Sequence, residues 1–199
     1  MGKGANYKVK FRRRREERTS FYKRKRLIIS RKPLFVVRIS NKYVTVQIIK
    51  PEANGDLVLT SSHSRELSKN YSWPASCKNT PAAYLTGFLC GSRAVSKGIQ
   101  EAAPYIGLHS PSHGAKVFAA LKGALDAGLK LKHEEHILPK HSRLRGEHIA
   151  SYASKLATEN PKLYEERFSL YLSKGLKPED LPKIFDQVKS QIVESLKAG

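Results

Sequence analysis

The segment Leu34–Ile49, which reads LFVVRISNKYVTVQII, decides the fold. It contains two runs rich in β-branched and apolar residues, and Asn41 and Lys42 separate them. Two such runs joined by two residues, the first of them Asn, predict a β-hairpin. Residues 51–56 supply a second turn, and residues 57–64 follow as a third strand. We therefore predict a three-stranded antiparallel meander.

Two helices are expected after the meander. The first opens at Thr80-Pro81, because Thr is a suitable N-cap and Pro is tolerated at the first helical position. Its apolar residues recur near helical spacing and should face the sheet; they are Leu85, Phe88, Leu89, Val95 and Ile99. Gly87 and Gly91 lie one turn apart on this helix, and close helix–sheet packing accounts for them.

A short buried strand is predicted at residues 104–109, and residues 110–114 form a loop that leads into the second helix. That helix ends near Gly128, and its apolar face consists of Val117, Phe118, Leu121, Ala124 and Leu125. The order of strands and helices predicts an α/β fold (α+β-like): a small, mostly antiparallel sheet with helices packed on one face.

From about Gly146 onward the pattern is helical throughout. Asn160-Pro161 is a typical helix start, and Gly175 is a plausible helix end. The last helix carries a narrow apolar stripe formed by Ile184, Phe185, Val188, Ile192 and Leu196. Such a stripe docks onto the protein's own core or onto another protein, and the first reading is favoured because stripes of this kind usually face a core.

The charge of the chain is unevenly distributed. Its 199 residues hold 37 Lys+Arg and 17 Asp+Glu, a net charge of +20. Residues 1–32 carry +12, residues 33–146 carry +8 and residues 147–199 carry none net. We therefore predict a basic N-terminal arm (1–32), a moderately basic α/β core (33–146) and a helical C-terminal extension (147–199). So strong a positive charge predicts a polyanionic partner.

The arm is the first candidate binding element, because its dense cations alternate with aromatic rings that can stack on unpaired bases. A nuclear-import-type patch or an anionic-membrane patch are the alternatives for such a segment. The arm residues predicted to contact RNA are Lys8, Lys10, Arg12, Arg13, Arg14, Arg15, Arg18, Tyr22, Lys23, Arg24 and Arg26.

Two features of the core also suit RNA. Arg38, Asn41 and Lys42 cluster where the hairpin turns, although a solvated turn explains them equally well. Two helix starts offer N–H groups and a positive dipole end to a phosphate. These starts contain Lys78, Asn79, Thr80, Ser112, His113 and Lys116.

The sequence offers no constellation for catalysis or metal binding. It lacks a phosphate-binding glycine loop, a dinucleotide fingerprint and a nucleophile elbow. His133 and His136 are spaced three apart, unlike zincin ligands, and two cysteines cannot make a four-thiolate zinc site. We predict no cofactor, no metal and no enzymatic activity.

Other classes are disfavoured. No apolar stretch reaches the roughly 20 residues of a membrane span, and no secretory signal is evident. An anionic-membrane module lacks a basic amphipathic helix. An RNA-processing nuclease, the main alternative, needs paired carboxylates, and the candidates sit in no recognisable pair: Asp56, Glu66, Glu101 and Asp126.

Several segments together resemble the archaeal and eukaryotic 5S-rRNA-binding protein of the large ribosomal subunit, the counterpart of the bacterial large-subunit protein numbered eighteen. The matching segments are YKVKFRRRRE (7–16), RISNKYV (38–44), NTPAAYLTG (79–87), VFAALKGALDAG (117–128) and RGEHI (145–149). Each match is weak alone, but the ordered set is specific.

The resemblance implies a core that grips 5S rRNA and an arm that threads between 5S rRNA and large-subunit rRNA. It also implies a place in the central protuberance, beside the other 5S-rRNA-binding ribosomal protein, in the cytoplasmic ribosome. No membrane contact and no homo-oligomer are expected. Lys116 stands where Arg is frequent in this family, which keeps the charge but loses bidentate geometry.

Overall fold

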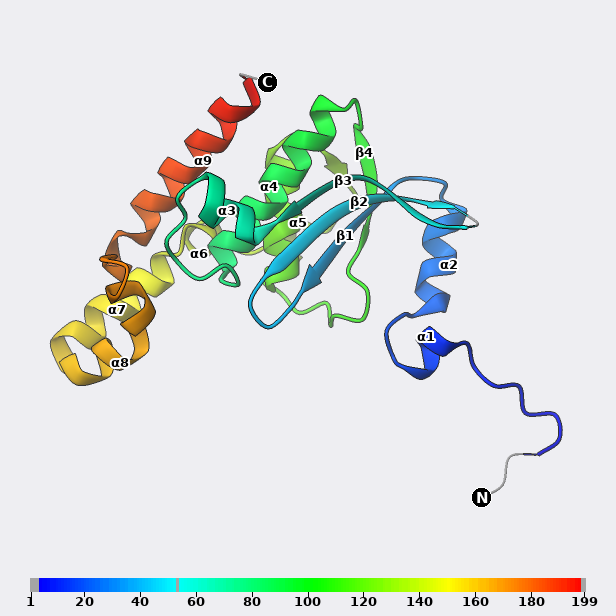
Figure 1. The fold of residues 1–199 in the computed structure, drawn as a ribbon, viewed down its shortest axis with the longest axis horizontal. Helices are drawn as coiled ribbons and strands as arrows, with labels where there is room; N and C mark the ends of the chain where they lie inside the picture. The colour runs from blue at the N-terminus through cyan, green and yellow to red at the C-terminus, as the bar shows by residue number, and fades with distance from the viewer. Residues whose placement is uncertain (1–3, 53, 198–199) are drawn as a thin grey trace.

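A five-stranded sheet forms the middle of the protein (Figure 1), seen in a computed structural model that describes residues 4–52 and 54–197. The strands are β1 Leu34–Ile39, β2 Val44–Glu52, β3 Gly55–His63, β4 Glu101–Tyr105 and β5 Lys130–Leu131. The helices are α1 Arg12–Arg15, α2 Phe21–Ile29, α3 Ser64–Asn70, α4 Thr80–Ser96, α5 Lys116–Asp126, α6 His141–Arg145, α7 Glu147–Glu159, α8 Pro161–Leu172 and α9 Leu181–Lys197, with 3-10 turns η1 Glu135–Ile137 and η2 Pro178–Asp180.

The strand order is β3-β2-β1-β4-β5. The first three strands in sequence pair antiparallel, whereas β4 pairs parallel to β1 and β5 pairs parallel to β4. The predicted α/β class and the antiparallel meander are therefore confirmed, but the sheet as a whole is mixed. Its parallel half arises because α4 and α5 act as crossover connections, which return the chain to the sheet in the same direction.

The hairpin forms as predicted. The Ser40 N–H donates to the Tyr43 carbonyl at 2.8 Å, so Asn41 and Lys42 occupy the tip. The second turn is tighter than residues 51–56, because Pro51 pairs with Asp56 within the β2–β3 ladder. Ala53, at the centre of that predicted turn, lies outside the described residues.

Helix α4 is the central helix of the core, and most of its residues are buried. Its N-cap is Asn79, whose side-chain oxygen accepts from the Ala82 N–H at 2.8 Å; Thr80 is the first helical residue. The prediction of Thr as the cap was wrong by one position. Pro81 is accordingly the second helical residue and not the first, and it is tolerated there because helix N-termini leave the first N–H groups without an intrahelical acceptor. Of the predicted apolar residues, Leu85, Phe88 and Leu89 are buried and Ile99 packs against the core, but Val95 is 43% exposed.

Gly87 and Gly91 face α5, not the sheet. A Cβ added at Gly87 would lie 1.9 Å from the Ala120 carbonyl oxygen, and one at Gly91 would lie 2.8 Å from the Ala124 Cα. The same holds for Gly123 of α5, because a Cβ added there would lie 2.1 Å from a backbone oxygen of α4. Close helix–sheet packing was therefore the wrong explanation; these glycines allow two helices to approach backbone to backbone.

The fourth strand begins earlier than predicted. β4 covers Glu101–Tyr105, and residues 106–109 leave the sheet in a turn at which Gly107 has a φ of +65°. Parallel pairing with β1 therefore stops at Val36–Tyr105, although β1 itself continues to Ile39. The expected strand at residues 104–109 is thus mostly loop, and this loop continues through residues 110–114 to α5.

Helices cover both faces of the sheet, which corrects the prediction of one face. The larger core lies between the sheet and α4, α5 and α9. On the other face, Leu34, Val36, Ile49 and Tyr105 form a small cluster, and Leu27 of α2 packs against it. Alternate β1 side chains point to opposite faces, so Leu34 and Val36 serve this second cluster while Phe35 and Val37 serve the first.

The C-terminal helices pack partly on the core. Asn160 caps α8 by accepting from the Leu163 N–H at 3.2 Å, and Gly175 adopts a φ of +69° beyond its end, as predicted. Phe185, Val188 and Ile192 of α9 are buried in the main core. The docking of the last helix onto the protein's own core is therefore confirmed.

Candidate nucleic-acid interface

The arm begins as an exposed cationic segment and ends as a docked helix. In α1, four consecutive arginines are all exposed. The Arg13 Nε donates to the Thr19 Oγ1 at 2.9 Å, which ties α1 to the connection before α2. Ser20 accepts from the Lys23 N–H at the start of α2. The arm is thus helical in two short pieces, and most of its Lys and Arg side chains are exposed.

Three contacts fix α2 on the sheet. Leu27 packs on the small apolar cluster, Arg24 forms an ion pair with Asp56, and Lys32 forms one with Glu101. Exposed ion pairs add little stability individually. Together with the apolar contact, however, they give α2 one orientation, so the cations of α2 keep a defined position relative to the core.

Other predicted arm residues are exposed on α2. The guanidinium of Arg26 lies 4.4 Å from the centroid of the Tyr22 ring, and both side chains are exposed. Lys23 and Arg26 also line a shallow hollow of about 240 Å³ beside Tyr105. Cation and ring are therefore available together to a nucleic acid.

A concave site, named here the arm hollow, lies between the arm and the second face of the sheet. It has a volume of about 660 Å³, and the residues that line it include Arg13, Arg18, Phe21, Arg24, Arg38 and His109. Arg38 reaches it because it follows Leu34 and Val36 on the same face of β1. The structure thus brings Arg38 to the arm, whereas Asn41 and Lys42 remain exposed at the hairpin tip.

A second concave site joins the two predicted helix starts. This helix-start hollow has a volume of about 420 Å³, and its lining includes Thr80, His109, His113, Lys116 and Arg143. Helix α5 has no side-chain cap, since Ala115 precedes it. Its first N–H groups therefore add to the positive field of these side chains.

The helix-start hollow gathers positive charge from Lys116 and Arg143. Burial, and then the charge of Lys78, lower the pKa of Lys116. Lys78, two residues before α4, thus repels Lys116, but neither Lys78 nor Asn79 lines the hollow itself. A phosphate between them would relieve this repulsion. Ser112 is exposed in the adjacent loop and does not line the hollow.

Two residues of this surface were missed by sequence reasoning. His109 lines both hollows, and Arg143 projects into the second from α6. Arg143 belongs to the basic run Lys140–Arg145, whose charge was a usable signal, but only the fold shows that α6 lies beside the start of α5. Nothing in the sequence pointed to His109, because it falls in the segment 104–109 that is predicted to be a buried strand.

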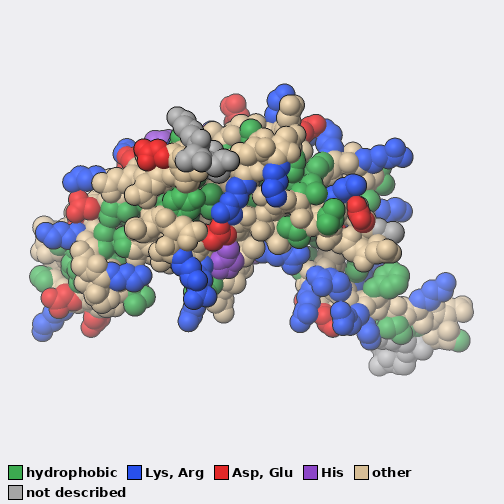
Figure 2. Space-filling view, turned by 45° about the horizontal axis from the view of Figure 1, so that its top comes forward, with side chains coloured by type: hydrophobic (Ala, Val, Ile, Leu, Met, Phe, Trp, Pro, Cys, Tyr) green, Lys and Arg blue, Asp and Glu red, His purple; other side chains and the backbone are tan. Residues whose placement is uncertain are grey.

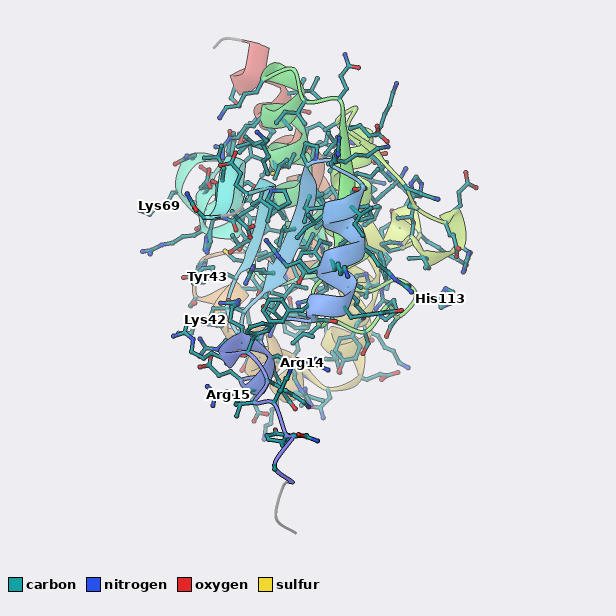
Figure 3. All side chains as sticks on the ribbon, turned by 90° about the vertical axis from the view of Figure 1, so that its right-hand side faces the viewer. Arg14, Arg15, Lys42, Tyr43, Lys69 and His113 are labelled. Carbon is teal, nitrogen blue, oxygen red and sulfur yellow. The ribbon has the colours of Figure 1, made fainter. Side chains whose placement is uncertain are left out.

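These elements occupy one side of the molecule. In Figure 1 the hairpin tip, the loop before α5 and α1 lie along the lower side, while α7, α8 and α9 lie at the end opposite the arm. Figure 2 shows Lys and Arg side chains gathered around the arm, and mixed charges over the C-terminal helices. Figure 3 places Lys42 on one side of α2 and His113 on the other, with Arg14 and Arg15 below.

The four carboxylates considered for a nuclease do not form a metal site. Each has a separate cation partner: Asp56 pairs with Arg24, Glu66 with Arg93, Glu101 with Lys32 and Asp126 with Lys122. Across residues 4–52 and 54–197, no group of three or more His, Cys, Asp or Glu side chains is placed to hold a metal ion. Within the same ranges, no helix is long and apolar enough to cross a membrane.

An α/β core with a docked basic arm and two cationic hollows is the arrangement of a candidate nucleic-acid-binding protein. Residues 5–105 match the family described as ribosomal large subunit proteins 60S L5 and 50S L18. The chain is also 51% identical over 197 residues to the large ribosomal subunit protein uL18 of Aeropyrum pernix, covering 99% of this chain and 92% of that protein. It therefore belongs to the uL18 family of large-subunit ribosomal proteins, in its archaeal-type form.

Further relatives agree over nearly the whole chain. The uL18 protein of Ignicoccus hospitalis is 53% identical over 197 residues, which are 99% of this chain and 96% of that protein. That of Thermofilum pendens is 52% identical over 196 residues, which are 98% of this chain and all of that protein. The predicted family and the predicted absence of enzymatic activity are confirmed by this membership.

Proposed function

We propose that this protein binds 5S rRNA and helps attach it to large-subunit rRNA in the central protuberance. The arm, the hairpin tip and the two hollows form the RNA-binding surface. The observation that carries the proposal is that segments distant in sequence, from α1 to α6, bring their cations to one side of a single fold. Its partners are then 5S rRNA, large-subunit rRNA and neighbouring ribosomal proteins, including the other 5S-rRNA-binding protein.

The core and the arm have different roles in RNA binding because the core elements are held more firmly than the arm. The helix-start hollow is built by α4, α5 and α6, so its phosphate-binding groups have fixed positions before RNA arrives. Residues 4–18 have few contacts with the core, and they contribute charge more than shape. We therefore assign the main recognition of 5S rRNA to the core (33–146). We assign to the arm (1–32) a path between 5S rRNA and large-subunit rRNA along which it contacts both, and the extension (147–199) faces protein neighbours.

Competition binding tests the proposal. Labelled 5S rRNA is displaced from the full chain by unlabelled 5S rRNA or by an RNA of the same length and shuffled sequence, at about 150 mM salt. We expect 5S rRNA to compete at least ten times better, because fixed phosphate contacts require the matching RNA shape. Equal competition by the shuffled RNA would overturn 5S rRNA as the ligand and leave only a general polyanion binder.

A further inference from the structure

The arm hollow has an apolar floor beneath a cationic rim. Val36, Tyr105 and Leu108 contribute apolar surface to its lining, whereas Arg13, Arg18 and Arg38 contribute guanidinium groups. A hollow that bound only phosphate would not need the apolar part. Its volume of about 660 Å³ falls in the range of roughly 300–1,000 Å³ that is typical of small-ligand pockets.

Charge in the arm hollow exceeds what its own carboxylate can neutralise. Asp56 is the one acidic residue among its lining residues, and it is paired with Arg24. Arg18 pairs with Glu16 at 3.3 Å outside the hollow. Arg13 is held by the Thr19 hydroxyl, a neutral partner that leaves its charge uncompensated. Arg13 and Arg38 are therefore the guanidinium groups best placed to receive a phosphate.

Aromatic rings also line the arm hollow. Phe21, the first residue of α2, is 37% exposed although it lines the hollow, and its ring centroid lies 5.8 Å from that of Phe11. The imidazole of His109 belongs to the same lining. Exposed rings beside guanidinium groups are the usual means by which proteins hold an unstacked base.

A paired RNA helix does not fit this shape. Its phosphates lie on the outside of a convex cylinder, and its bases are covered by their stacking and pairing partners. We infer that the arm hollow binds one unpaired nucleotide of the RNA, with the base on the apolar floor against Phe21 and the phosphate at Arg13 and Arg38. This inference rests on the proposed function, because it names what the RNA inserts at that surface.

Phe21→Leu in the full chain tests the inference, since it keeps an apolar side chain at the start of α2 and removes the flat ring. Affinity is measured at 50, 100 and 200 mM salt for 5S rRNA and for a fully paired RNA duplex of similar length. We expect a loss of about 5- to 150-fold for 5S rRNA, the range found when base-stacking rings are removed. The salt slope should not change, because stacking releases no counterions. Duplex binding should also be unaffected.

Ile29→Ala is the matched control, because Ile29 lies on the same helix, is 69% exposed and is absent from the lining of the hollow. It should bind both RNAs as the unmodified chain does. Ultraviolet crosslinking of the unmodified chain to 5S rRNA adds a direct readout, and we expect an unpaired nucleotide attached at Phe21 or His109.

The inference is overturned if Phe21→Leu binds 5S rRNA as tightly as the unmodified chain. It is also overturned if the variant loses the same factor on the duplex, or if crosslinks form only outside the arm hollow. Failure of the proposed function looks different. In that case the unmodified chain itself binds 5S rRNA no better than the duplex, whatever residue occupies position 21.

Discussion

Removing residues 1–18 should reduce the salt dependence of RNA binding without unfolding the core. The deletion takes away eight Lys+Arg and two Glu but leaves Ser20 to cap α2 and Leu27 to hold it on the sheet. Each phosphate neutralised contributes about 0.7–0.9 to the slope of log K against log salt. Six net charges therefore correspond to a slope change of about 4–5, so between 50 and 200 mM salt the full chain loses about 250- to 1,000-fold more affinity than the deletion.

Fluorescence anisotropy with labelled 5S rRNA over this salt range measures the slope, and circular dichroism verifies that the core remains folded. A charge-matched control replaces six tail cations by Gln: Lys155, Lys162, Arg167, Lys174, Lys177 and Lys183. These six residues lie at the end of the molecule opposite the arm. We therefore expect the salt slope of this control variant to differ from that of the full chain by less than about 1. Equal slope changes in the deletion and in the control would refute a localised arm contact and leave only net charge.

Three further outcomes are expected. Gly123→Ala should lower the free energy of unfolding in urea by about 1–3 kcal/mol or more, because its Cβ would lie 2.1 Å from a carbonyl oxygen of α4; unchanged stability would contradict the close helix contact. Lys116→Gln should raise the urea midpoint, because it removes a partly buried charge beside Lys78, yet reduce the salt slope of 5S rRNA binding by about 1. Burial and the charge of Arg143 lower the pKa of His148, so the folded state binds fewer protons, and stability falls as pH drops below about 6.5. His148→Asn should show a smaller loss of melting temperature between pH 7.5 and 5.5, and an identical loss would contradict that assignment.

The parts of the fold that sequence could predict are those that local rules determine. The hairpin at Leu34–Ile49 has strand-forming runs and a two-residue turn, and both are visible without knowledge of the fold. Asn160-Pro161 is likewise recognisable as a helix start. The Asn side chain can accept a hydrogen bond from an N–H group of the first turn, and Pro is tolerated there because it has no N–H of its own. The unequal charge of arm, core and tail is a property of composition alone.

The parts that sequence could not predict depend on tertiary contacts. Gly87 signalled close packing, but only the path of the chain shows that its neighbour is Ala120 on another helix. The strand expected at residues 104–109 stops at Tyr105 because the chain turns away at Gly107, whereas β1 itself continues to Ile39. Arg143 enters the helix-start hollow only because α6 packs against α4, whose first residue lines the same hollow as the start of α5. Which cations share one site is therefore decided by packing.

Lysine footprinting of the full chain, alone and bound to 5S rRNA, tests most directly whether this surface is the RNA interface. Acetylation of each lysine is quantified by mass spectrometry in both states. We expect RNA to protect Lys8, Lys10, Lys42, Lys78 and Lys116 and to leave Lys162, Lys177 and Lys183 as reactive as in the free protein. Protection of the tail lysines, with Lys42 and Lys116 unchanged, would contradict the interface proposed for this protein.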